Sequence, residues 1–335
     1  MAGPVGIALV GMGWWGQKML AVLDAAPDDI RVIRAVEPNV DAVKDLCAER
    51  GVMLSAEYAD ALSDPDVEAV VLATPHSMHT EQIARAVKAG KHVFCEKPLA
   101  LTKAEAERSV ALCRDAGLVL GMGHERRFEP PVADMLAKAD AGELGRVHQI
   151  EANFSHDKFL ALDRDNWRLK ADQAPAGGMT ATGIHLLDLS VRLLGSAESV
   201  LCHCENLSSD LPQGDTVAAY VKFAGGGTSY VSASLANPFM SRFTVYGSKG
   251  WIDIRDRAHV EAPDGWVVTS AMAGGPIETH EVGKAEPVKD NLVAFARAVR
   301  GERDYPITGE QLVNNIALIE AVFRSATSGQ IERVA

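Results

Sequence analysis

A lysine within a Glu-Lys-Pro segment stands where it could do chemistry. Lys97 follows the strand-like run His92–Cys95, so we expect it at the carboxyl end of a β-strand. Ligands bind outside the carboxyl ends of strands in open α/β sheets. A lysine ammonium has three donors, and burial can lower its pKa. The segment favours a site that handles a hydroxyl or carbonyl group, with a surface lysine before a helix as the alternative.

A glycine-rich turn follows the first apolar run of the chain. Val5–Val10 reads as a strand buried on both faces, and a helix is expected after the turn. Gly11 would allow the tight turn, Gly13 would let a pyrophosphate approach, and Gly16 would permit close helix–strand packing. The phosphates would lie at a helix N-terminus, where N–H groups favour anions. The residues of this turn that we expect to contact a dinucleotide are Gly11, Met12, Gly13, Trp14, Trp15 and Gly16.

An acid at the end of the second expected strand favours NAD over NADP. Glu37 lies 21 positions after Gly16 (37 − 16), where a carboxylate can bind both ribose hydroxyls and repel a 2′-phosphate. Arg34 should point to the opposite face of the strand and is a poor phosphate clamp. The alternative for Glu37 is an ordinary solvated loop acid.

The elements that must position these residues alternate between strand and helix. Such alternation predicts a parallel sheet with helices on both faces. A capping box at Thr102–Glu105 is expected to start one of the helices. The expected strands are 5–10, 30–36, 67–72, 92–95 and 119–121, and the expected helices are 15–26, 40–50, 79–89 and 103–116.

The pattern changes after His124, where strands joined by short turns indicate an antiparallel sheet. The glycine run 224–227 is expected to form a hairpin turn. An apolar helix over 179–194 should carry His185, and two helices, 288–300 and 309–328, should end the chain. The further strands are expected at 147–154, 216–223, 228–235, 242–246 and 251–254. We therefore expect an α/β domain over residues 1–123 and an α+β domain over residues 124–335.

Composition excludes several classes of function. The 335 residues carry a formal net charge of −12, which argues against nucleic acid and anionic membranes as partners. No apolar run is long enough for a membrane helix, and no signal peptide is expected, because the first strand runs straight into the glycine turn. Five scattered cysteines fit a reducing cytoplasm. We expect no metal, because the Cys202-His203-Cys204 spacing fits alternate side chains on a strand.

The chain resembles the Gfo/Idh/MocA family, the glucose–fructose oxidoreductase and inositol dehydrogenase group, over nearly its whole length. The resemblance implies a Rossmann domain followed by a domain with an open, mostly antiparallel sheet. It also implies pyridine-nucleotide oxidoreduction of a sugar, polyol or related hydroxy compound. The motifs that carry it are Gly11 to Gly16, Ala73-Thr74-Pro75 with His79, Ala89 to Val93 leading into Glu96-Lys97-Pro98, Arg127-Phe128, Trp167-Arg168, and Gly177-Gly178 leading to Gly183-Ile184-His185 and Asp188.

The resemblance also implies a catalytic set of one lysine, one aspartate and one histidine. Lys97 matches the lysine and His185 the histidine, but the aspartate position falls on Ala181. A carboxylate beside the histidine would fix its tautomer and raise its basicity. Asp188 is a possible substitute, one helical turn after His185. Pairing of Asp188 with Arg192 at i+4 is the alternative.

Further contacts follow from the same resemblance. A carboxylate at Glu125, where relatives often have asparagine, would favour substrate hydroxyls as donors and disfavour an acidic substrate. Arg126 and Arg168 would instead favour an acidic substrate. For Trp167 and Arg168, a packed corner with a surface salt bridge is the alternative. The expected cofactor contacts beyond the glycine turn are Glu37, Thr74, Pro75, His79, Glu96 and Lys97. The expected substrate contacts are Glu125, Arg126, Trp167, Arg168, Thr182 and His185.

The leading hypothesis is an NAD-dependent dehydrogenase of a small-molecule hydroxy compound. His185 would accept the hydroxyl proton as hydride leaves for the nicotinamide, while Lys97 stabilises charge on the same oxygen. Two other classes stay open: elimination or isomerisation with recycled NAD, and a non-catalytic NAD-binding regulatory protein, which Ala181 would permit. One face of the second sheet, if apolar, would need a partner, so a homodimer or homotetramer is expected.

Overall fold

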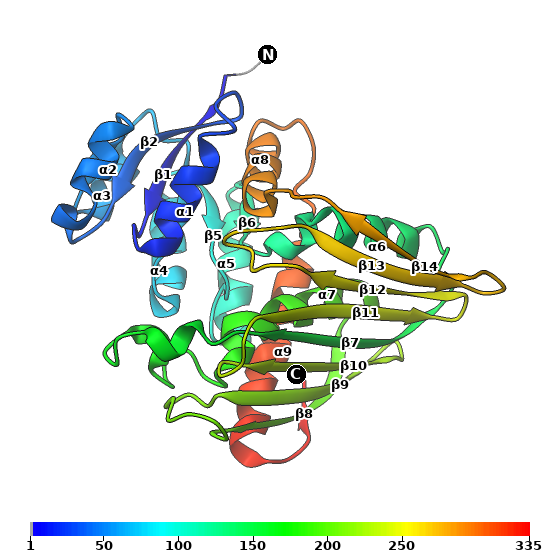
Figure 1. The fold of residues 1–335 in the computed structure, drawn as a ribbon. Coiled ribbons are helices and arrows are strands. Elements are labelled where there is room, and N and C mark those ends of the chain that lie inside the picture. The colour runs from blue at the N-terminus through cyan, green and yellow to red at the C-terminus, as the bar shows by residue number, and fades with distance from the viewer. Residues whose placement is uncertain (1–2) are drawn as a thin grey trace. The chain divides into compact units, whose positions relative to one another are not determined.

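The computed structural model describes residues 3–335, which form two compact units (Figure 1). The first unit contains the described residues up to Glu125 together with Val288–Leu312, and the second contains Arg126–Pro287 and Val313–Ala335. The sequence places Val288–Leu312 in the second domain, whereas the structure packs it with the first. The Asn291 amide donates to the Met122 carbonyl at 2.8 Å, and the Phe295 ring packs edge-on against Phe94.

The first unit holds a six-stranded sheet within the described residues, in the order β3-β2-β1-β4-β5-β6. Every pair in it is parallel, as the alternating pattern predicts. All six residues of β1 are buried, which explains its continuous apolar run. The strands are β1 (Val5–Val10), β2 (Ile30–Val36), β3 (Met53–Ser55), β4 (Ala69–Leu72), β5 (His92–Cys95) and β6 (Leu120–Met122).

Helices α1 to α5 connect these strands, and α8 comes from a later part of the chain. The Thr102 side chain accepts a hydrogen bond from the Glu105 N–H at the start of α5, as the capping box predicts. The region expected as one helix over 40–50 is a 3₁₀ turn, Val40–Ala42, followed by a short helix. The helices are α1 (Trp14–Leu23), α2 (Lys44–Glu49), α3 (Tyr58–Ser63), α4 (His79–Lys88), α5 (Lys103–Asp115) and α8 (Pro287–Val299).

The second unit is built on a sheet of nine strands among its described residues, in the order β14-β13-β12-β11-β7-β10-β9-β8-β15. The β7–β10 pair is parallel and the other pairs are antiparallel. The glycine run after β9 forms the expected hairpin turn into β10. The strands are β7 (Val147–Ser155), β8 (Ala197–Glu205), β9 (Thr216–Phe223), β10 (Thr228–Ser234), β11 (Met240–Gly247), β12 (Gly250–Asp256), β13 (Trp266–Met272), β14 (Ile277–Val282) and β15 (Glu332–Arg333).

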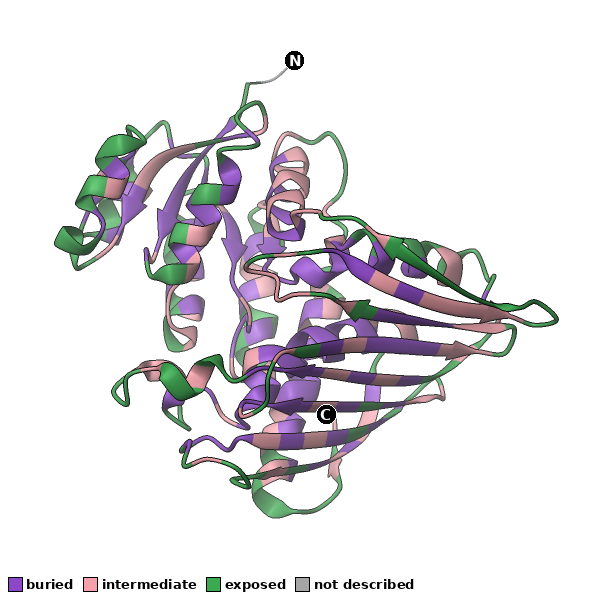
Figure 2. Cartoon of the chain, viewed as in Figure 1, coloured by how far each residue is buried: buried purple, intermediate pink, exposed green. Residues whose placement is uncertain are grey.

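Helices α6 (Pro130–Asp140), α7 (Ile184–Leu194) and α9 (Gly309–Ser328) lie on one face of this sheet (Figure 1). Alternate residues of the central strands are buried beneath them, as the banded colouring of Figure 2 shows. The helix expected over 179–194 begins instead with a π-helical turn, Met179–Gly183, and becomes α-helical at Ile184. It ends at Gly195, which has a positive φ.

Candidate functional site

The glycine turn has the close packing that its spacing predicts. A Cβ atom at Gly11, which has φ +92°, would lie 2.7 Å from the Ala73 carbonyl oxygen, and one at Gly16 would lie 2.1 Å from the Gly11 oxygen. A Cβ at Gly13 would meet no atom within 4 Å among the described residues. Gly13 is also the N-cap of α1, where no side chain caps the helix and its first turn contains no acid. The turn therefore combines a rigid backbone with room for an anion.

The Glu37 carboxylate lies against this turn. One oxygen accepts a hydrogen bond from the Met12 N–H at 3.0 Å, and the other accepts from the Asn39 N–H at 3.1 Å. Arg34 points elsewhere and pairs with Asp64 at 2.9 Å, and the hydrogen bond from this guanidinium lowers the pKa of the Asp64 carboxyl. Glu37, which could bind a ribose, is thus held at the glycine turn. Arg34 is paired with Asp64 and does not neutralise this carboxylate.

The lysine segment follows β5 as expected. Lys97 is half-buried, and its backbone N–H donates to the Glu96 carboxylate at 3.2 Å. Glu96 is itself buried, and a Cβ at Gly123 would lie 2.5 Å from its Oε2 atom. The Glu96 side chain is therefore packed inside the first unit, and Lys97 is the residue of this segment with an accessible side chain.

Of the three expected contacts after β4, two are accessible and one is not. Thr74 and Pro75 are half-buried, and the Thr74 hydroxyl donates to the Gln82 side chain at 2.6 Å. His79 is fully buried between two carbonyls, with Nδ1 2.8 Å from the Pro98 oxygen and Nε2 3.0 Å from the Thr74 oxygen. Both ring nitrogens of His79 therefore face the protein, and its contact with the cofactor stays a prediction.

In the second unit, His185 lies buried in the first turn of α7. The π-helical turn before it is tied to the sheet by Thr182, whose hydroxyl lies 2.7 Å from the Phe154 carbonyl oxygen and 3.0 Å from that of Gly178. Thr182 is also buried, and its two contacts anchor the segment that carries His185. Contact between Thr182 and substrate stays a prediction.

Asp188 has a different partner from the one expected on its own helix. Its two oxygens accept hydrogen bonds from Nε and Nη2 of Arg127, both at 2.7 Å, and both side chains are buried. Arg192, the expected i+4 partner, instead pairs with Asp140. The residues of the Arg127–Asp188 pair are 61 positions apart, and the local helical spacing could not reveal it.

The position of the implied family aspartate is apolar. Ala181 is half-buried, whereas the other residues of the π-helical turn are buried. It packs on a buried cluster together with two half-buried neighbours, Phe159 and Leu162. The cluster consists of Leu169, Leu211 and Leu235.

The remaining expected substrate contacts differ in accessibility. The Arg126 guanidinium is buried and makes two hydrogen bonds to Asp256, at 2.8 and 3.3 Å, which indicates a structural role. Glu125 is also buried. Trp167 and Arg168 are half-buried, and the guanidinium stacks 4.4 Å from the indole centroid. Trp167 and Arg168 thus pack on each other, and both remain accessible.

The sequence patterns missed a cluster of rings at the end of β7. The members come from three separate segments, and no local spacing connects them, although His156 is a weak candidate by type alone. Their ring centroids lie 5.2 to 6.5 Å apart, and the Arg126 guanidinium lies 5.4 Å from one of them. The rings are Phe154, His156, Phe159, Phe239 and His259.

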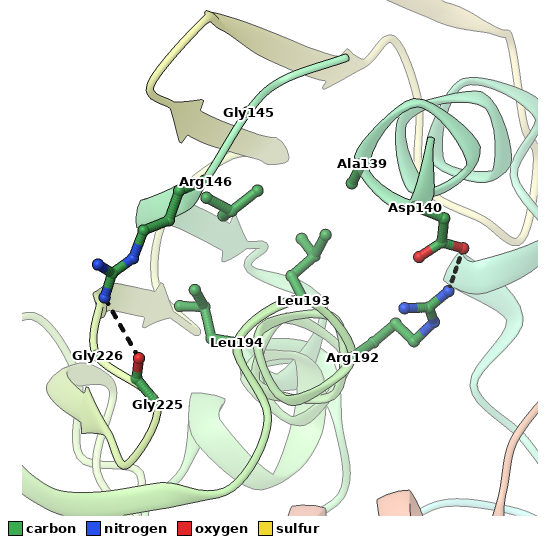
Figure 3. Close-up of a pocket in the computed structure, with 10 residues that line it drawn as sticks. Ala139, Asp140, Gly145, Arg146, Arg192, Leu193, Leu194, Gly225 and Gly226 are labelled. Atoms are coloured by element: carbon green, nitrogen blue, oxygen red, sulfur yellow. Dashed lines mark hydrogen bonds and ion pairs between the residues drawn. The ribbon is translucent and has the colours of Figure 1, made fainter. Parts of the chain in front are cut away.

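The second unit also contains a groove of about 300 Å³ (Figure 3). It is formed by the ends of α6 and α7, the start of β7 and the β9–β10 turn. Arg146 reaches the Gly225 carbonyl at 3.4 Å, and Arg192 pairs with Asp140, as the dashed lines show. None of the expected site residues lines this groove.

Within residues 3–335, no group of three or more His, Cys, Asp and Glu side chains could hold a metal ion. No helix of the same residues is long and apolar enough to cross a membrane.

The fold and the turn geometry agree with the comparison to known proteins. Residues 5–124 match the GFO_IDH_MocA oxidoreductase family with its NAD-binding Rossmann fold, and residues 132–253 match the GFO/IDH/MocA C-terminal domain. The chain belongs to this family. It is therefore an NAD(P)-dependent oxidoreductase of the type that acts on CH–OH groups.

Three relatives illustrate the range of the family. The 1,5-anhydro-D-fructose reductase of Ensifer adhaerens is 30% identical over 91% of this chain and 94% of its own. The D-xylose 1-dehydrogenase (NADP(+)) 2 of Haloferax volcanii is 25% identical over 98% of each chain. The crystal structure of aldose-aldose oxidoreductase from Caulobacter crescentus, complexed with glycerol, has a TM-score of 0.87 and 25% identity, over 98% of this chain and 99% of that one.

Proposed function

We propose that this protein is an NAD-dependent dehydrogenase of a sugar, polyol or related hydroxy compound. The observation that carries the proposal is the Glu37 carboxylate held 3.0 Å from the Met12 N–H, at the turn where the pyrophosphate would lie. The names of the Ensifer reductase and the Caulobacter oxidoreductase support a carbohydrate substrate. The bound cofactor would accept or donate the hydride. The protein must bind and orient the substrate and move the proton of its hydroxyl group.

In the proposed reaction, His185 accepts the proton of the substrate hydroxyl, and the Lys97 ammonium donates a hydrogen bond to the same oxygen. His185 is buried, which supports this role, because a base that is shielded from water accepts a proton from the substrate rather than from solvent. Asp188 is better described as the partner that holds Arg127 than as a member of the catalytic set, since both its oxygens serve that pair. Trp167 and Arg168 are the accessible candidates for binding the rest of the substrate.

The test is a His185→Ala variant assayed with a panel of sugars, inositols, polyols and hydroxy acids at the absorbance band of reduced nicotinamide. Loss of general-base help should lower kcat by about 10²- to 10⁴-fold. NAD binding measured by calorimetry should not change. His203→Ala, which removes an exposed histidine from β8, is the matched control and should keep full activity. Full turnover of His185→Ala would show that another group is the base.

We further propose NAD rather than NADP as the cofactor, because the Glu37 carboxylate would repel a 2′-phosphate. Glu37→Gln keeps an acceptor for the Met12 N–H but removes the charge. The ratio of kcat/KM with NADP to that with NAD should rise about tenfold, which corresponds to about 1.4 kcal/mol. Asp41→Asn removes an exposed charge four residues away and should leave the ratio unchanged. An unchanged ratio in Glu37→Gln would contradict the proposal.

A second candidate uses the same two residues, Lys97 and His185, for an elimination or isomerisation in which NAD is reduced and reoxidised within one cycle. NAD would then stay bound, and no substrate would give a net rise of reduced cofactor. Product analysis by NMR after incubation of each compound with the NAD-loaded protein separates the two candidates.

We also propose a cytoplasmic location and self-association. All five cysteines are unpaired with one another, as a reducing compartment would leave them. The face of the nine-stranded sheet opposite the helices carries adjacent exposed tyrosines, Tyr220 and Tyr230, which are 52% and 47% exposed. A second copy of the chain is the proposed partner of this face.

A further inference from the structure

His79 joins two strand ends inside the first unit. It is the first residue of α4 and lies between the segment that follows β4 and the segment that follows β5. Its Nδ1 atom is 2.8 Å from the Pro98 carbonyl oxygen, and its Nε2 atom is 3.0 Å from the Thr74 carbonyl oxygen. We call this arrangement the carbonyl bridge. Pro98 directly follows Lys97, so the bridge ends one residue from the lysine.

The carbonyl bridge also reaches toward the glycine turn. The Ala73–Thr74 backbone packs so closely against the turn that a Cβ at Gly11 would lie 2.7 Å from the Ala73 oxygen and 3.1 Å from the Thr74 methyl carbon. The Thr74 hydroxyl is held in turn by Gln82 on α4. A continuous set of contacts therefore runs from the glycine turn through His79 to the segment of Lys97.

The ring of His79 cannot satisfy both carbonyls in its neutral form, because a neutral imidazole has one N–H. Complete burial lowers its pKa below the ordinary histidine value of 6.5, despite the opposing effect of the two carbonyls. The position at the N-terminus of α4 acts in the same direction, because the helix dipole disfavours a cation there. At neutral pH the ring is therefore neutral and can donate to one of the two carbonyls, and the contact of Nδ1 with Pro98 is the shorter of the two.

We propose that His79 is a positioning residue whose Nδ1–H group donates to the Pro98 carbonyl and thereby fixes the segment that carries Lys97. This inference rests on the proposed role of Lys97 at the substrate oxygen. The Nε2 contact with Thr74 is the weaker end of the carbonyl bridge, and its loss should matter less for the reaction.

The protonation assignment can be tested without any substrate. Protein labelled with ¹⁵N-histidine should show, for His79 at neutral pH, a neutral ring protonated at Nδ1 in a long-range ¹H–¹⁵N correlation spectrum. His79→Asn identifies the signals of this residue by their loss. A charged ring, or a ring protonated at Nε2, would overturn the proposal.

Two substitutions separate the ends of the carbonyl bridge. The amide nitrogen of asparagine lies as many bonds from Cα as Nδ1 does, whereas that of glutamine corresponds to Nε2. His79→Asn can therefore keep the bond to Pro98, and His79→Gln can keep only the contact with Thr74. The kcat of His79→Gln should fall about 10²-fold, because Lys97 would be displaced. The kcat of His79→Asn should fall less than about tenfold. NAD affinity should be the same in both variants.

A purely structural role would lower kcat equally in both variants, and that result would overturn the proposal. Tyr58→Phe is the matched control, because it removes a buried hydrogen bond of 3.1 Å to the Gln82 carbonyl on the same helix. It should lower Tm without lowering kcat.

One further readout stays informative if the protein turns over none of the substrates. Lysines methylated with a ¹³C label give NMR signals, and Lys97→Arg identifies the signal of Lys97. That signal should move in His79→Gln and stay near its wild-type position in His79→Asn. A signal at one position in all three proteins would refute the positioning role, whatever the reaction is.

Discussion

A buried ion pair, Arg127–Asp188, joins the start of the second unit to the helix that carries His185. Helical spacing predicts Arg192 as the partner of Asp188, but Arg192 is near the surface and pairs with Asp140. Arg127 offers two parallel N–H groups at 2.7 Å, which satisfy both oxygens of a buried carboxylate. Such bidentate bonds are stronger and more specific than an exposed i,i+4 pair. A long-range contact therefore overrides the local rule.

Removal of one member of this pair should destabilise the protein more than removal of both. Arg127→Met leaves the Asp188 carboxylate buried without its partner, which should cost about 3–5 kcal/mol. Asp188→Leu leaves the guanidinium in the same condition. The double variant should recover much of either loss, since the two residues share one interaction. Urea unfolding of the wild type, the two single variants and the double variant measures the free energy of unfolding of each. If the two single losses of stability added up in the double variant, the prediction would be contradicted.

Ala181 and His79 show what residue types can and cannot indicate. The sequence alone shows that the implied aspartate position holds an alanine. It cannot show that this alanine packs on Leu169, Leu211 and Leu235, which come from three separate segments. In the same way, the position of His79 after β4 suggests a ligand contact, whereas its two carbonyl partners become visible only when the strand ends are placed together.

At the scale of elements, strong patterns predicted the boundaries well. The strands Ile30–Val36, His92–Cys95 and Thr216–Phe223 and the helix Gly309–Ser328 have the expected bounds. Apolar runs and clear alternation mark their buried faces. Other elements lack such a clear pattern, and seven strands and α-helices of the described residues were not expected. These are β3, α3, α6, β8, β13, β14 and β15.

The grouping of Val288–Leu312 with the first unit could not be predicted from its own pattern. An amphipathic helix shows that it has a buried face but not which unit covers that face. The Asn291 amide and the Tyr305 hydroxyl, which both bond the Met122 carbonyl, make the assignment in the structure.

The loop between β8 and β9 depends on one carboxylate. Asp215 is fully buried and accepts hydrogen bonds from the N–H groups of Leu207 and Ser208 and from the hydroxyls of Ser209 and Thr216. Burial alone would raise the pKa of Asp215, but these hydrogen bonds lower it to about 2. The loop carries Leu211, so its order also supports the apolar cluster beneath Ala181.

The contribution of Asp215 to stability should depend on pH. Because its folded pKa is below the unfolded value of about 3.9, it stabilises the fold above that pH, by about 2.6 kcal/mol, and loses this effect as the pH falls toward 2. Asp215→Asn should therefore be less stable than the wild type at neutral pH, and the difference should shrink below about pH 4. Urea unfolding of both proteins between pH 7 and the lowest pH at which they fold measures the trend. A constant difference would contradict it.

At the scale of the whole molecule, the open face of the nine-stranded sheet is the feature that calls for a partner. The row of paired residues that crosses this face includes Tyr220 opposite Tyr230, and Tyr230 opposite Glu151. Aromatic side chains are enriched in interfaces between proteins. Charged groups also lie on the face, including Arg242 and Asp253, which pair with each other. Such a mixed surface fits association between two copies in which the paired charges remain satisfied.

Placing a charge in the centre of this face should separate the copies without unfolding them. Tyr230→Glu puts a second carboxylate opposite Glu151, and like charges directly opposite each other oppose burial in an interface. We expect the wild type to sediment as a dimer or tetramer and the variant as a smaller species. Leu207→Glu, which changes a side chain 67% exposed on a loop, is the control and should leave the mass unchanged. Because the side chain of Tyr230 is half exposed, the variant should keep the wild-type circular dichroism spectrum. A monomeric wild type, or an unchanged mass in Tyr230→Glu, would show that this face is not where the copies meet.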